Sequence, residues 1–68
     1  MKFTIEIISA AGNGTETVAR RFDITAINPS RALRHGRALL EEWKKRHPSS
    51  GYARILNARG VELYTVTG

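Results

Sequence analysis

The clearest chemistry in this sequence is the binding of phosphate groups by closely spaced cations, namely Arg31, Arg34, Arg37 and Lys45. Arg31 and Arg34 fall in or next to the first turn of a predicted helix, where the helix dipole favours anions over cations. Local preferences that are broken without compensation tend to mark function. The free backbone N–H groups of that turn, together with two arginines, could hold a phosphate. The alternative is an ordinary solvated helix surface.

A second group of residues suits contacts with unpaired bases or with another protein. It consists of Tyr52, Arg54, Leu56, Tyr64 and Val66, which the predicted strand register places on one face of a sheet. Tyrosines interleaved with arginine suit stacking on bases. Contiguous exposed apolar area usually marks an interface, so this face could instead pack against a symmetry-related copy, or it could be an ordinary hydrated surface.

Enzymatic or metal chemistry is not indicated. The acidic residues form no evident catalytic dyad, and no nucleophile can be grouped with a histidine and a carboxylate. The chain has no cysteine, and His35 and His47 fall on different faces of the predicted helix, which argues against a shared metal ion. We therefore expect a protein that is not an enzyme, with no catalytic residues, no metal and no cofactor.

The size and charge of the chain limit its architecture and its partners. With 68 residues and a formal charge of +5, it is expected to form one small basic domain over residues 1–68. The charge favours nucleic acid or an acidic protein as a partner. A core of this size is marginal and has no disulfide to support it, so a homo-oligomer is expected. No apolar run is long enough to span a membrane and no signal peptide is evident, which predicts a cytoplasmic protein.

One amphipathic helix is predicted between Asn28 and His47. Asn28 can cap the first turn, and Pro29 suits the first helical position. Pro48 disfavours helical backbone at the residue before it, so the helix should end at His47. At about 100° per residue the apolar side chains gather into one arc. The members of this arc are Ala32, Leu33, Gly36, Leu39, Leu40, Trp43 and His47.

Two residues of this arc have specific roles. Trp43 lies in its middle and is predicted to belong to the core. Gly36 weakens a helix by about 1 kcal/mol relative to alanine, so its place in the arc predicts a close approach between helix and sheet.

Alternating polar and apolar residues predict strands on both sides of the helix. Lys2–Ser9 and Thr17–Thr25 form the first hairpin, joined by a turn at Gly12-Asn13-Gly14. Their predicted inward residues are Phe3, Ile5, Ile7, Val18, Phe22 and Ile24.

The second hairpin follows a connector at Pro48-Ser49-Ser50-Gly51. Tyr52–Asn57 and Val61–Val66 are predicted to flank a type I turn with Gly60 at a bulge position. This register pairs Ile55 with Leu63. It turns Ala53, Ile55, Val61 and Leu63 to one face, and the second group of residues to the other. A shift of one residue would exchange the two faces.

These elements predict an α+β fold of order ββαββ, with a four-stranded, mostly antiparallel sheet of two hairpins and the helix on one face. Val18-Ala19, the helix rich in Ala, Arg and Leu, and the run Ala53–Leu63 resemble small bacterial ββαββ domains of unknown function. In that family the last hairpin carries an acidic turn before a Gly-x-Glu-Leu run, whereas this chain has Asn57 and Arg59 at the turn. The resemblance covers the second half of the chain and implies no activity.

Two functions fit these features. The first is a small non-catalytic basic module that binds nucleic acid, through the phosphate backbone or as single strands. The alternative is a homo-oligomeric protein–protein interaction module that uses the open sheet face.

Overall fold

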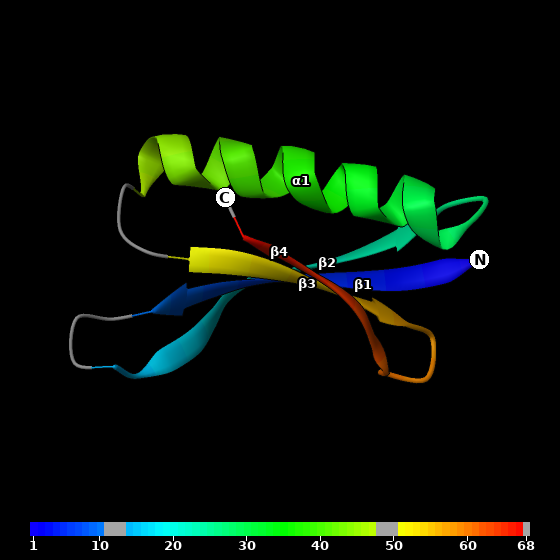
Figure 1. Cartoon of the computed structure of the whole chain (residues 1–68), viewed down its shortest axis with the longest axis horizontal. Coiled ribbons are helices and arrows are strands. Elements are labelled where there is room, and N and C mark those ends of the chain that lie inside the picture. The colour runs from blue at the N-terminus through cyan, green and yellow to red at the C-terminus, as the bar shows by residue number, and fades with distance from the viewer. Residues whose placement is uncertain (11–13, 48–50, 68) are drawn as a thin grey trace.

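The computed structural model describes residues 1–10, 14–47 and 51–67, which form one open sheet covered on one face by a helix (Figure 1). The elements are β1 (Lys2–Ala10), β2 (Glu16–Thr25), α1 (Pro29–Arg46), β3 (Gly51–Asn57) and β4 (Glu62–Thr67). The strand order is β2-β1-β3-β4, and every neighbouring pair is antiparallel. This arrangement confirms the predicted α+β fold of order ββαββ. The predicted turn residues Gly12-Asn13 and connector residues Pro48-Ser49-Ser50 lie outside the described residues.

Both predicted ends of α1 are confirmed. The Asn28 side chain accepts a hydrogen bond from the backbone N–H of Arg31 at 2.9 Å, and Pro29 occupies the first helical position. His47 caps the other end by donating its backbone N–H to the carbonyl of Trp43 at 2.9 Å. Three cations in the last turn face the negative end of the helix dipole, which stabilises this terminus.

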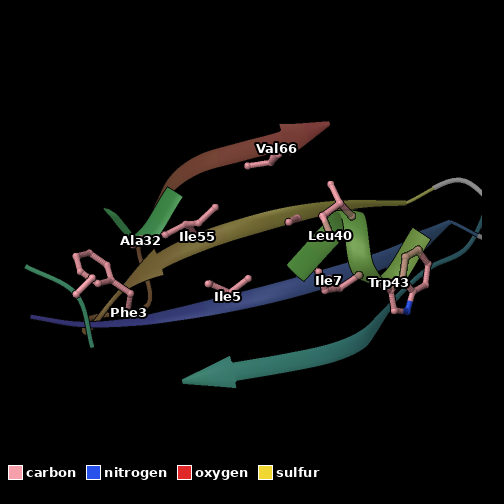
Figure 2. Packing of buried hydrophobic residues seen from close by; sticks show 10 residues of the cluster. Phe3, Ile5, Ile7, Ala32, Leu40, Trp43, Ile55 and Val66 are labelled. Atoms are coloured by element: carbon pink, nitrogen blue, oxygen red, sulfur yellow. The ribbon is translucent and has the colours of Figure 1, made fainter. Parts of the chain in front are cut away.

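The core lies between α1 and the sheet (Figure 2). Its largest fully buried side chains are Ile5, Ile7, Leu40 and Ile55. Each stabilises the fold by about 1.5–3 kcal/mol relative to an exposed position. Trp43 is 9% exposed and belongs to the same cluster, as predicted. Its indole stacks on the His47 imidazole with the ring centroids 4.7 Å apart.

A bulge in β2 moves one residue that was predicted to face the core to the opposite face of the sheet. Arg20 pairs with Ile7, but Ile8 pairs with Val18, so Ala19 is an extra residue without a partner on β1. Because side chains alternate along a strand, one extra residue exchanges the faces beyond it. Val18 was predicted to face the core, and it is instead exposed beside Ile8 on the opposite face.

A second bulge makes the predicted register of the last hairpin wrong. Ile55 pairs with Tyr64 and Leu56 pairs with Glu62, so Leu63 is the extra residue. The turn itself is confirmed, because Gly60 has a φ of 81° and donates its N–H to the Asn57 carbonyl at 2.9 Å. The predicted register is therefore wrong only in β4, the strand that follows the turn. Val61 and Leu63 were predicted to share a face with Ala53 and Ile55, which are buried, but they are 54% and 37% exposed.

Among the described residues, α1 is the only helix, and it lacks the length and apolar character that crossing a membrane requires.

Candidate nucleic-acid interface

The exposed side of α1 carries the predicted phosphate-binding cations. Arg31, Arg34 and Arg37 are spaced three residues apart along the helix, and all three side chains are exposed. In the part of the chain that the structure describes, none of the three is paired with a carboxylate. The first turn of α1 contains no acidic residue. These guanidinium groups are therefore accessible to an external anion.

Lys45 lies two turns further along α1 and has a partner of its own. Its ammonium group is 3.7 Å from the Glu42 carboxylate, and both side chains are exposed. Such exposed pairs contribute at most about 1 kcal/mol and are screened by salt, so a phosphate could displace Glu42. Lys45 thus extends the cationic surface of α1 only in competition with Glu42.

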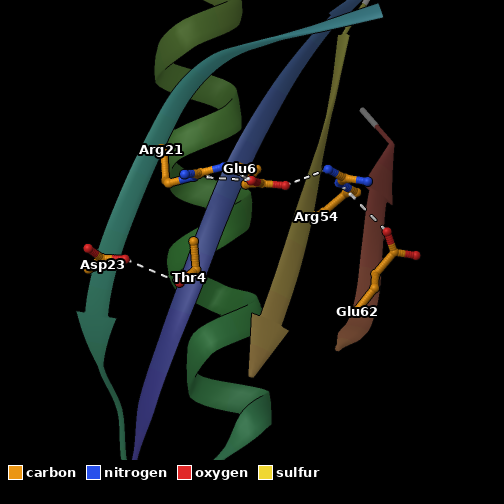
Figure 3. A network of polar contacts seen from close by, with 6 residues as sticks. All are labelled: Thr4, Glu6, Arg21, Asp23, Arg54 and Glu62. Atoms are coloured by element: carbon orange, nitrogen blue, oxygen red, sulfur yellow. Dashed lines mark hydrogen bonds and ion pairs between the residues drawn. The ribbon is translucent and has the colours of Figure 1, made fainter. Parts of the chain in front are cut away.

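The sheet face opposite α1 is organised by Glu6, a residue that the sequence did not single out (Figure 3). Glu6 is 5% exposed and lies on the central strand β1. One carboxylate oxygen accepts hydrogen bonds from Arg21 Nε and Nη2 of β2, at 3.1 and 2.7 Å. The other accepts a hydrogen bond from Arg54 Nη2 of β3. Glu6 therefore pairs with two arginines, one from the strand on each side.

Further charges continue this row to the edge of the sheet. Arg54 Nε lies 3.8 Å from Glu62 Oε1 on β4, an ion pair without a hydrogen bond. The Arg21 and Arg54 guanidinium groups hold the pKa of Glu6 below its ordinary value, against the opposing effect of burial. The Glu6 carboxylate in turn raises the pKa of Arg54. The carboxylates of Glu6 and Glu62 balance the charges of Arg21 and Arg54, so this row contributes to the fold itself.

The predicted sheet-face interface is only partly assembled. Tyr52, Arg54 and Leu56 lie on the open face, because they alternate with the core residues of β3. Tyr64 and Val66 were also predicted there, and this placement is wrong. The bulge at Leu63 turns both towards α1, where Val66 is 8% exposed and Tyr64 packs against the core.

The positions of Tyr64 and Val66 on the helix side weaken the case for base stacking on the open face. Of the two tyrosines, only Tyr52 remains on that face. Its phenol interacts with the Glu16 carboxylate, and this interaction raises the pKa of Tyr52. With Arg54 held by Glu6, the interleaved aromatic and cationic surface that stacking requires is not formed by Tyr52 alone.

The role of Glu6 could be inferred only after strand order is known. In the sequence it is one polar residue in an alternating strand, and nothing marks it as buried. The pairing of β1 with both β2 and β3 brings Arg21 and Arg54 opposite it, at the same register position. The described residues contain no cluster of three or more side chains able to hold a metal ion.

Fold and surface together define a small α+β domain with a basic helix and an internally paired sheet face. The chain matches no protein-family model, and no curated protein or solved structure is significantly similar to it. The resemblance to small bacterial ββαββ domains therefore stays a prediction.

Proposed function

We propose that this protein is a small non-catalytic module that binds nucleic acid by contacting phosphates with the exposed side of α1. One observation carries the proposal. Arg21 and Arg54 are both held by Glu6, whereas Arg31, Arg34 and Arg37 are exposed and unpaired among the described residues. The fold thus pairs Arg21 and Arg54 of the sheet internally and presents Arg31, Arg34 and Arg37 of the helix to solvent.

The electrostatics of α1 support the same reading. Arg31 and Arg34 lie near the positive end of the helix dipole, where a cation is destabilising by a few tenths of a kcal/mol. A bound phosphate would reverse this effect by placing an anion between the dipole and the arginines. Lys45 and the formal charge of +5 add attraction over a longer range.

These contacts would position nucleic acid without reading its sequence. Arginine and lysine bound to phosphates supply affinity that depends on salt, whereas specificity needs contacts with base edges or with DNA shape. We therefore expect similar affinity for unrelated sequences of the same length. Duplex binding is favoured over single strands, because the stacking surface predicted on the sheet is not assembled.

A salt titration tests the proposal. The logarithm of the binding constant for duplex DNA should fall linearly with the logarithm of salt concentration, with a slope near −0.9 for each contacted phosphate. Replacing Arg31 and Arg34 together with glutamine should lower the magnitude of that slope by about 1–2 and weaken binding to all sequences alike.

A matched control separates local contacts from net charge. Lys2 and Arg59 are exposed and lie outside α1, so the double variant K2Q/R59Q changes the formal charge equally. Its slope should stay close to that of the wild type. Equal effects of the two double variants would show that only net charge matters. A dissociation constant above about 10⁻⁴ M at low salt would contradict the proposal and would show that the exposed side of α1 is only a solvated surface.

One observation favours the second candidate, a homo-oligomeric interaction module. Ile8 is only 4% exposed although it lies on the face without a helix, and Tyr52 and Leu56 on the same face are partly buried. A small apolar surface therefore exists beside the charged row. Molar mass measured by light scattering tests this candidate, which predicts a dimer at micromolar concentration and loss of the dimer in L56E.

A further inference from the structure

The two edges of the sheet differ in how they are protected against pairing with another strand. Edge strands present unpaired backbone N–H and C=O groups, and proteins commonly protect them with bulges or inward-pointing charges. β2 has both, since Ala19 is bulged and Arg20 lies on the helix side next to Trp43. β4 also has a bulge, at Leu63, but the four residues after it, Tyr64–Thr67, include no charge and no proline. The edge of β4 is thus open to an added strand.

A groove lined by residues of β4 and α1 runs beside this edge. Its volume is about 750 Å³. The apolar part of its lining comes from Leu40 and Val66, whose side chains belong to the core shown in Figure 2. Every second side chain of a strand added to β4 would point towards α1 and enter this groove.

The charges around the groove identify the kind of partner. Arg37, Lys44 and Lys45 line it from α1, together with the carboxylate of Glu41. Lys45 is also 3.7 Å from the Glu42 carboxylate, an exposed pair that an acidic partner would have to displace. A second copy of the chain paired through β4 would bring the same cations against one another, since a two-fold axis repeats the groove. Acidic side chains complement this lining and like charges oppose it.

From these observations we propose that the β4 edge and its groove bind an extended acidic segment of another protein as a fifth strand. Main-chain hydrogen bonds to β4 would supply affinity, and alternate side chains would supply specificity. This site shares Arg37 and Lys45 with the cationic surface proposed for nucleic acid but does not include Arg31 or Arg34. The R31Q/R34Q variant therefore distinguishes the failure of one proposal from the failure of the other.

The spacing of the cations gives a motif for the segment. Arg37 and Lys45 are separated by eight residues of helix, or about 12 Å along the axis. Residues four apart in a strand are separated by about 13 Å. Two acidic residues at that separation would therefore reach the two cations, and an apolar residue midway between them would contact the small exposed part of Val66.

A designed peptide tests this motif. The probe is a capped heptapeptide of threonine, with glutamate at its second and sixth positions and valine at its fourth. Titrated into the ¹⁵N-labelled protein, it should shift the amide signals of Leu63–Thr67 and of the α1 residues that line the groove. A peptide with lysine in place of both glutamates should bind at least about tenfold more weakly.

Backbone pairing is tested on the peptide, which leaves the protein unchanged. In an added strand only alternate N–H groups face β4, so N-methylation of one alternate set should abolish binding and methylation of the other set should not. Equal effects of the two sets would contradict strand addition.

Two protein variants complete the test. E41Q removes the one carboxylate among the described residues that line the groove and should tighten peptide binding about two- to fivefold. D23N makes an equal change in charge on β2 and should leave peptide binding unchanged. The R31Q/R34Q variant should also leave peptide binding unchanged. Absence of peptide binding would overturn the proposal, as would amide shifts confined to β2. Shifts of Leu63–Thr67 that depend on protein concentration without peptide would instead assign this edge to a second copy.

Discussion

Gly36 of α1 lies so close to Ile55 of β3 that a Cβ atom at position 36 would come within 2.8 Å of the Ile55 Cδ1 atom. Both residues are buried, and Ile55 is fully enclosed by the core. The contact explains why a helix tolerates glycine here, at a loss of about 1 kcal/mol relative to alanine. The predicted close approach of helix and sheet is therefore confirmed, and Ile55 defines it.

The first prediction follows from this contact. Overpacking of a core costs about 1–3 kcal/mol, which outweighs or cancels the helix propensity that alanine adds. G36A should therefore lower the free energy of unfolding by up to about 2 kcal/mol. In an I55V background, which lacks the Cδ1 atom, the same change should become neutral or stabilising. Urea unfolding of the four proteins measures this coupling.

The control is A38G at an exposed position of α1, where only helix propensity should act. It should cost about 1 kcal/mol. If G36A stabilised the wild type by that amount, the sheet would have room for a Cβ atom and the contact with Ile55 would not be limiting.

The second prediction concerns the charged row on the open face. E6Q removes the carboxylate that holds Arg21 and Arg54, whose side chains are 63% and 34% exposed. Breaking a fully buried pair costs about 3–5 kcal/mol, but these guanidinium groups remain partly hydrated, so a loss of about 1–3 kcal/mol is expected.

D23N provides the comparison for E6Q on the same face. Asp23 is exposed and accepts a hydrogen bond from Thr4 at 3.1 Å. Its substitution should change the free energy of unfolding by no more than about 0.5 kcal/mol. Similar losses in D23N and E6Q would show that burial of Glu6 contributes nothing.

The third prediction is a pH dependence of stability. The pKa of Glu6 is lower in the folded protein than its ordinary value of 4.5, because the Arg21 and Arg54 guanidinium groups favour the ionised form. The stabilisation is therefore fully present above about pH 4.5 and is lost as the pH falls through the lowered pKa. The difference in unfolding free energy between wild type and E6Q should shrink between pH 7 and pH 2.5. A constant difference over that range would contradict the assignment.

The helix and the order of the elements could be predicted because their signals are local. Asn28, Pro29 and Pro48 mark the ends of the helix, and the apolar arc with Trp43 follows from the helical period alone. The bulges at Ala19 and Leu63 could not be predicted, because a bulge adds one residue without changing the residue types around it. Each bulge inverted the faces beyond it, so Val18, Tyr64 and Val66 were placed on the wrong side of the sheet.

The candidate sites also differ in whether the sequence alone could predict them. The cations Arg31, Arg34 and Arg37 were identified from spacing within one helix, which needs no knowledge of the tertiary structure. Glu6 and the β4 groove depend on which strands are neighbours. Strand order arises from packing between segments far apart in the chain, and alternation within one strand does not encode it.

The last prediction separates the stability of α1 from its proposed function. Arg31 is the third residue of the helix, and its backbone N–H is bound by the Asn28 side chain. R31E places an anion near the positive end of the dipole and completes a reciprocal cap with the Asn28 backbone N–H. It should raise the free energy of unfolding by about 0.5–1 kcal/mol and weaken nucleic-acid binding.

K45E makes the same charge change near the negative end of α1, where an anion is unfavourable. It also loses the ion pair with Glu42, so it should lower the free energy of unfolding. Urea unfolding at low salt distinguishes the two variants, and changes of equal sign would show that net charge, not the dipole of α1, governs the effect.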